Sequence, residues 1–140
     1  MRANQQLQYA IYGVFDLAYN GSERPTCIQE IATRQAIPAR YLEQIFQKLR
    51  RAGIVKSKRG PGGGYVLGRS PEEISLADVL LAVQGVLLTH SDDAPRPPRR
   101  RPRFVWDLIR QGMQDTLGRW SIADLCREAA GRGLDRKSVV

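Results

Sequence analysis

Residues 49–68 read LRRAGIVKSKRGPGGGYVLG, and this stretch decides the fold that the sequence predicts. Gly53 indicates the end of a helix, because glycine adopts a left-handed cap conformation at no steric cost. Apolar residues then give way to basic ones between Ile54 and Arg59, which is typical of a short strand. The glycines and Pro61 within residues 60–64 suit a hairpin turn, and residues 65–67 suit its return strand. The stretch therefore predicts a helix followed by a basic two-stranded β-wing.

The wing is expected to bind a polyanion. Three basic residues lie beside a turn whose glycines let the backbone approach a ligand closely. An ordinary hairpin whose charges only keep it soluble is the alternative interpretation. A phosphate-binding P-loop is excluded, since the glycines do not lead into a helix with Gly-Lys-Ser or Gly-Lys-Thr. The expected contacts of the wing are Lys56, Ser57, Lys58, Arg59, Gly60, Pro61, Gly62 and Gly63.

Composition limits the class of protein. The chain has 140 residues, 42% of them hydrophobic, which suffices for one packed domain with an appended element. Its net charge of +8 and pI near 10.1 favour a nucleic acid or an anionic surface as partner. The sequence shows neither a membrane-spanning apolar run nor a signal peptide, so we expect a cytoplasmic protein with no membrane partner. It has no catalytic triad or nucleotide fingerprint, and we expect no enzymatic activity.

Three helices are predicted ahead of the wing. Apolar residues at helical spacing indicate a first helix that ends near residues 20–21. A second helix is expected to open at Pro25 and Thr26, since Thr26 and Gln29 have capping-box spacing, which puts Cys27 in its first turn. Pro38 suits the start of a third helix that continues to about Ala52. The second and third helices, joined by a tight turn, form a helix-turn-helix.

The third helix has one apolar face and one polar face. Its apolar residues recur at helical spacing from Leu42 to Leu49, and the opposite face carries groups that donate hydrogen bonds. Side chains near the amino end of a recognition helix reach base edges, and later ones usually meet phosphates. We therefore expect Arg40, Glu43 and Gln44 to read bases and Gln47, Lys48, Arg50 and Arg51 to contact the DNA backbone. The alternative is a merely solvated helix face.

The segment RYLEQIFQKLRRAGIVKSKRGPGGGYVLGR, residues 40–69, resembles the signature of the Rrf2-type winged-helix regulators, the family of IscR, NsrR and CymR. The similarity extends from QYAIYGVFDLA at residues 8–18 through ISLADVLLAVQG at 74–85 to SIADL at 121–125. The resemblance implies a dimeric bacterial transcription factor. It further implies that the helix beginning with Pro38, Ala39 and Tyr41 enters the major groove, and that Arg59 with Gly60 to Gly63 enters the minor groove.

After the wing, Ser75 and Asp78 have capping spacing ahead of another helix, and Phe104 begins a long one. A lone helix cannot bury an apolar stripe, so we expect it to pair with its copy in a two-fold homodimer. The residues of this stripe are Phe104, Val105, Leu108, Ile109, Met113 and Leu117. The expected organisation is a winged helix-turn-helix domain at 1–87, a Pro/Arg-rich linker at 88–103, the dimerisation and C-terminal helices at 104–130 and a flexible tail at 131–140. The linker arginines are either solvated or in contact with DNA.

The chain departs from the iron-sulfur members of the family, which resemble one another in carrying three cysteines ahead of the dimerisation helix. That interval holds none here, so no metal and no cofactor is predicted. His90, Asp92 and Asp93 could be metal ligands, but one histidine with two carboxylates indicates a metal only weakly, and a solvated loop is the favoured interpretation. Cys27 and Cys126 lack the spacing of a zinc site or a disulfide scaffold, although redox chemistry at either, or a cluster shared between subunits, remains an alternative.

The fold expected is mainly α with a small β-wing, with a long dimerisation helix appended. The function expected is that of a sequence-specific repressor that binds a palindromic operator in double-stranded DNA as a homodimer. A small-molecule effector or a partner protein would control it. The alternatives are a cluster-free module that controls or is controlled by a metabolic enzyme, redox regulation through Cys27, and a non-specific nucleic-acid coating protein.

Overall fold

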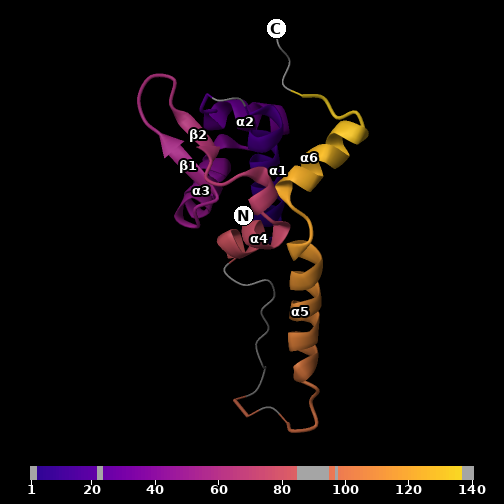
Figure 1. Ribbon diagram of the computed structural model, residues 1–140. Helices are drawn as coiled ribbons and strands as arrows, with labels where there is room; N and C mark the ends of the chain where they lie inside the picture. The colour runs from indigo at the N-terminus through magenta and orange to yellow at the C-terminus, as the bar shows by residue number, and fades with distance from the viewer. Residues whose placement is uncertain (1–2, 22–23, 85–94, 97, 137–140) are drawn as a thin grey trace.

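The computed structural model describes residues 3–21, 24–84, 95–96 and 98–136, and the fold is mostly helical with one two-stranded sheet (Figure 1). This confirms the predicted fold class. Most of the expected linker, including His90, Asp92 and Asp93, lies outside the described residues. The elements in chain order are α1 (Ala3–Asn20), α2 (Ile28–Gln35), α3 (Ala39–Arg51), β1 (Val55–Lys58), β2 (Gly64–Leu67), the 3-10 helix η1 (Pro71–Glu73), α4 (Leu76–Gln84), α5 (Phe104–Gly118) and α6 (Ile122–Gly131).

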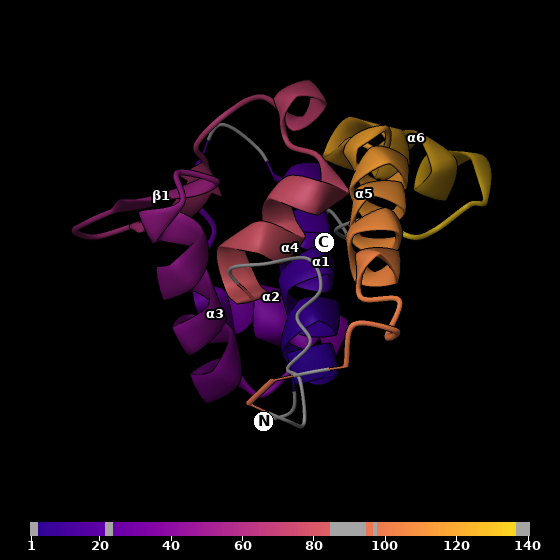
Figure 2. The same cartoon turned by 90° about the horizontal axis from the view of Figure 1, so that it is seen from below.

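Helix α1 is the centre of the fold. It packs against α2, α3, α4 and α6, and its residues Ala10 and Val14 are fully buried. Gly13 allows the close approach of α3, because a Cβ atom there would lie 2.7 Å from Cε1 of Phe46. Figure 2 shows α3 and the wing on one side of α1 and α4, with α5 and α6 on the other. The polar face of α3 is thereby left open to solvent.

The turn between α2 and α3 is tight, as predicted. Ala36 adopts a left-handed conformation with φ of 55°, and the Ile37 amide donates to the carbonyl of Ala32 at 2.9 Å. The predicted start of α2 is wrong, since the helix begins at Ile28 with Cys27 as its N-cap and has no side-chain cap. Thr26 instead exchanges two backbone hydrogen bonds with Tyr65 on the wing, which satisfy its amide and carbonyl there.

The wing is an antiparallel hairpin in which Val55 pairs with Leu67 and Lys58 with Gly64. Its turn is closed by the Gly63 amide, which donates to the Gly60 carbonyl at 2.8 Å. Gly64 must be glycine, because its φ is 155° and a Cβ atom would lie 2.4 Å from the carbonyl oxygen of Thr26. The residue ahead of the α2 N-cap is therefore hydrogen-bonded directly to the wing.

The C-terminal helices divide between the core and the surface. Capping boxes start α4 and α6, with Ser75 and Asp78 on one and Ser121 and Asp124 on the other. Helix α6 packs on α1 and η1 and buries Ile122 in the core. Helix α5 contacts α4, buries no residue fully and extends from the body as a stalk (Figure 1).

Candidate nucleic-acid interface

Helix α3 presents its predicted polar face to solvent. Its four apolar residues Leu42, Ile45, Phe46 and Leu49 are buried, which fixes the rotation of the helix. The side chains that remain exposed include most of those predicted to contact DNA: Pro38, Arg40, Glu43, Gln44, Gln47, Arg50 and Arg51. Ala39 and Tyr41 are half-buried at the start of the helix. The structure thus brings the expected contact residues of α3 onto one surface.

Two of these residues have partners that the sequence did not predict. The guanidinium of Arg40 lies over the Tyr41 ring, 4.7 Å from its centroid, and donates to the Tyr41 hydroxyl at 3.0 Å. Lys48 is half-buried and donates from Nζ to Oε1 of Gln6 on α1 at 3.0 Å. Tyr41 therefore orients Arg40 at the amino end of α3, and Lys48 ties α3 to α1.

The wing exposes its basic residues beside α3. Lys56, Lys58 and Arg59 are exposed, as are Ser57 and the turn residues 60–62, whereas Gly63 is half-buried. Tyr65 on β2 meets Phe46 of α3 edge to face, with ring centroids 5.0 Å apart. Because this contact and the Thr26 pairing fix the hairpin at two points, α3 and the wing present their polar groups as one unit.

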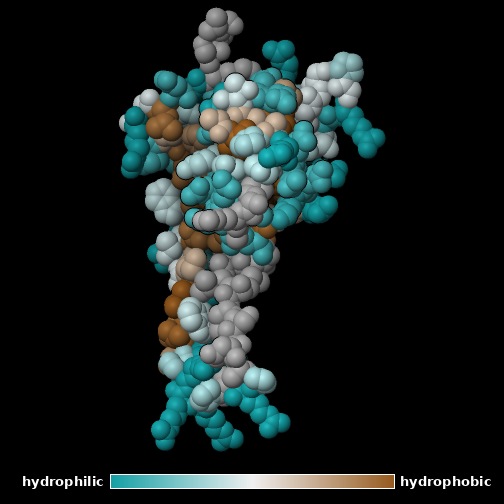
Figure 3. Space-filling view, turned by 180° about the vertical axis from the view of Figure 1, so that it is seen from behind, coloured by the Kyte–Doolittle hydropathy of each residue, from teal (hydrophilic) through white to brown (hydrophobic). Residues whose placement is uncertain are grey.

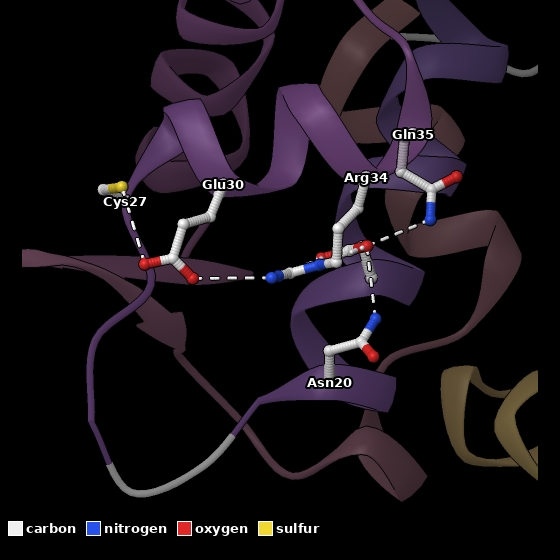
Figure 4. A network of polar contacts seen from close by, with 6 residues as sticks. Asn20, Cys27, Glu30, Arg34 and Gln35 are labelled. Atoms are coloured by element: carbon white, nitrogen blue, oxygen red, sulfur yellow. Dashed lines mark hydrogen bonds and ion pairs between the residues drawn. The ribbon is translucent and has the colours of Figure 1, made fainter. Parts of the chain in front are cut away.

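A buried charge network holds α1 to α2 (Figure 4). Asp16 is fully buried and accepts from Arg34 Nη2 at 2.7 Å, from Gln35 at 3.0 Å and from Asn20 at 3.2 Å. The hydrogen bond to Asp16 raises the pKa of Arg34 above its usual value, with Glu30 adding a smaller effect. The sequence analysis missed this network, although an aspartate amid the apolar residues of α1 is the signal that could have revealed it.

The two cysteines are free and half-exposed, on different helices. Cys27 directs Sγ toward Glu30 Oε1 at 3.9 Å, and it lines a hollow of about 430 Å³ between the start of α2 and the wing turn. Cys126 lies on α6, and burial raises the pKa of its thiol. A raised pKa lowers the thiolate fraction of Cys126 and so its reactivity as a nucleophile.

The apolar stripe of α5 is largely uncovered. Phe104 and Leu108 are 66% and 63% exposed, and Ile109 is 40% exposed. Val105, Met113 and Leu117 are half-buried. Figure 3 shows apolar side chains along the stalk that α5 forms. Among the described residues, none of the helices is long and apolar enough to cross a membrane.

Comparison with known proteins gives consistent matches. Residues 3–128 match the family model Rrf2, described as an iron-dependent transcriptional regulator. The chain is 33% identical to the protein rrf2 of Nitratidesulfovibrio vulgaris over 93% of its length and 90% of the relative. It is 45% identical to the HTH-type transcriptional regulator IscR of Photorhabdus laumondii, but the match spans 59% of this chain and only 51% of that protein. The global cysteine regulator CymR of B. subtilis has a similar structure, with a TM-score of 0.75, 30% identity and coverage of 91% and 98%.

The residues that the structure describes do not fit the iron site that this description suggests. The whole sequence has two cysteines, Cys27 at the N-cap of α2 and Cys126 on α6, and residues 88–103 contain none. In the part of the chain that the structure describes, no three His, Cys, Asp or Glu side chains come together as a metal site.

Proposed function

Because the chain belongs to the Rrf2 family of transcriptional regulators, we propose that it acts as a homodimeric repressor on a palindromic operator. Its relatives are regulators and not enzymes. The observation that carries the proposal is the joint exposure of the polar face of α3 and the basic wing on one fixed unit.

In the proposed complex, α3 lies in the major groove. Arg40, held by Tyr41, is placed to donate two hydrogen bonds to guanine, and Gln44 is suited to adenine. Glu43, between them in sequence, accepts from cytosine. Arg51 and the neighbouring polar residues Gln47 and Arg50 meet phosphates, while Lys48 contributes less because it also binds Gln6.

The wing then reaches the adjacent minor groove. Arg59 at its tip is exposed beside the turn, where the glycines at 60, 62 and 63 leave room for the backbone to approach the groove. A guanidinium in a narrow minor groove reads its width through the enhanced negative potential. The wing therefore favours A·T-rich sequence beside each half-site.

Two-fold symmetry of the protein would match the palindrome. The uncovered side chains of Phe104 and Leu108 support α5 as the dimer contact, since a C₂ interface pairs the same surface of both subunits. Burying this stripe in a dimer contact would contribute a favourable free energy of about 25 cal/mol for each Å² of apolar surface removed from water.

The proposal is tested with duplex DNA selected by the protein from a random pool. We expect an inverted repeat, preferred over scrambled duplex by about a thousandfold or more. The affinity should fall by about 0.9 logarithmic units per phosphate contact for each tenfold rise in salt. Arg59→Ala should weaken binding and relax the preference for A·T beside the half-sites.

Glu72→Ala is the matched control, since Glu72 is exposed on η1, outside the proposed DNA-binding surface. Binding that shows no sequence preference would instead identify a non-specific coating protein. If Arg59→Ala left the affinity for DNA unchanged, the proposal that the wing contacts DNA would be wrong.

A further inference from the structure

A second basic surface lies at the end of α5, far along the chain from the wing. We define the arginine segment as residues 98–103, which contain four arginines and no acidic residue. This short segment carries half of the net charge of +8. Arg99, Arg100 and Arg103 are exposed, and Figure 3 shows hydrophilic side chains spread from this end of the stalk.

The conformation of the segment keeps its arginines apart from the core. The Arg101 amide donates to the carbonyl of Pro98 at 3.1 Å, which makes a turn, and Pro102 precedes the N-cap of α5 at Arg103. Proline at two of six positions prevents the segment from continuing α5 as a helix. Arg99, Arg100 and Arg103 are therefore exposed on a turn ahead of α5, whereas Arg101 is half-buried.

The helix dipole of α5 does not favour positive charge at this place. The amino end of a helix carries a partial positive charge, so cations there are unfavourable and anions are favourable. The acidic residue in the first turn of α5 is Asp107, and it already pairs with Arg110 at 2.9 Å. Several arginines joined to a helix amino terminus instead form an arrangement that attracts a polyanion.

We propose that the arginine segment binds the phosphate backbone of DNA outside the phosphates that α3 and the wing of the same protomer contact. This inference rests on the proposed function. The segment contains no aromatic side chain, and its apolar side chains are only those of Pro98 and Pro102, so it offers a protein partner little apolar surface to anchor on. Arginine forks match phosphate oxygens, and DNA held by α3 is already present at high local concentration.

The distance supports a separate contact. Helix α5 has 15 residues and spans about 22 Å, and the segment lies at its free end, away from α3 and the wing (Figure 1). The proposed contact is therefore with phosphates that flank the two half-sites, beyond those that α3 and the wing contact. The contact adds affinity without reading bases, because phosphates carry no sequence information.

The test compares the double variant Arg99→Ala/Arg100→Ala with Arg127→Ala/Arg132→Ala. Both variants lose two exposed arginines, but Arg127 and Arg132 lie at the other end of the C-terminal region and pair with Asp124 and Glu128. Binding is measured against salt with a 40-base-pair duplex that contains a sequence selected by the parent protein, and with a duplex shortened to the two half-sites.

On the long duplex, the Arg99/Arg100 variant should lower the salt slope by about 3.6, because the dimer loses four arginines, if each arginine neutralises one phosphate. Its affinity deficit should then grow about four-thousandfold for each tenfold fall in salt. The deficit should shrink on the short duplex, and Arg99→Lys/Arg100→Lys should restore most of the slope.

A parental slope in the Arg99/Arg100 variant, or equal losses in both double variants, would overturn the inference. The inference would also be wrong if the Arg99/Arg100 variant bound DNA like the parent but no longer bound an acidic protein or RNA that the parent binds. The proposed function fails separately, if the parent protein itself selects no sequence.

Discussion

The buried carboxylate of Asp16 allows a quantitative test of what holds the helix-turn-helix together. Asp16 is fully buried, whereas the side chain of its partner Arg34 is 22% exposed. Asp16→Asn keeps the shape but removes the charge, and its new amide donor faces the donors of Arg34 and Gln35. The substitution therefore leaves the Arg34 guanidinium with only the longer pair to the exposed Glu30 carboxylate.

Breaking a buried ion pair costs about 3–5 kcal/mol. Because Arg34 keeps some contact with water, we expect the lower end, about 3 kcal/mol. Unfolding entropies of about 2.1 cal/mol/K per residue give about 0.3 kcal/mol/K for 140 residues. The melting temperature should therefore fall by about 10 °C, measured by circular dichroism at one fixed protein concentration because the protein is proposed to dimerise.

Glu30→Gln is the matched control, since it removes the second carboxylate that pairs with Arg34. That pair is 3.4 Å long, spans one helical turn and involves a Glu30 side chain that is 45% exposed. Exposed pairs of this kind contribute only about 0.3–0.5 kcal/mol. If Asp16→Asn destabilised the protein no more than Glu30→Gln, the assignment of Asp16 as the anchor of α2 would be wrong.

Four further predictions follow from other parts of the molecule. Leu108→Glu should convert the dimer into monomers in sedimentation, whereas Gln111→Glu, on an exposed polar position of α5, should not; a dimer in both cases contradicts the proposed interface. Gly64→Ala should abolish hydrogen-exchange protection of the Tyr65 amide, because its Cβ atom meets the Thr26 backbone, while Gly62→Ala, with open space around it, should preserve that protection. Iodoacetamide should modify Cys126 more slowly in folded than in urea-unfolded protein at pH 8, since burial raises its pKa and less thiolate is present; equal rates would refute this. Protein purified without oxygen should carry no stoichiometric iron and lack visible absorbance, and a coloured protein whose colour is lost in Cys27→Ser or Cys126→Ser would contradict that expectation.

Local sequence signals predicted the elements that depend on local chemistry. The spacing of Leu42 and Phe46 predicts the buried face of α3, and Gly53, with φ of 77°, ends the helix as expected. The glycine turn of the wing was likewise predicted, because positive φ angles are needed there. Such features require only neighbours a few residues away.

Features that depend on distant partners were missed. Thr26 has the spacing of a helix cap, yet its backbone pairs with Tyr65, and no local pattern encodes a partner so far along the chain. Asp16 interrupts an apolar stripe of α1. Its role is evident only in the folded protein, where Arg34 and Gln35 of α2 donate hydrogen bonds to it. The predicted contact residue Lys48 is similarly engaged by Gln6, because α1 and α3 cross there.

The segment ahead of α5, residues 98–103, carries four arginines and no cysteine. Thiolates at that place would bind iron, because they are soft, negatively charged ligands. The sequence has prolines and arginines there instead. A guanidinium cannot ligate a metal and repels cations, whereas it binds phosphate through two parallel hydrogen bonds. The same position in the fold therefore offers affinity for an anion in place of affinity for iron. A regulator built in this way would couple α5, and the dimer contact that it is proposed to make, to a polyanion rather than to a metal cluster.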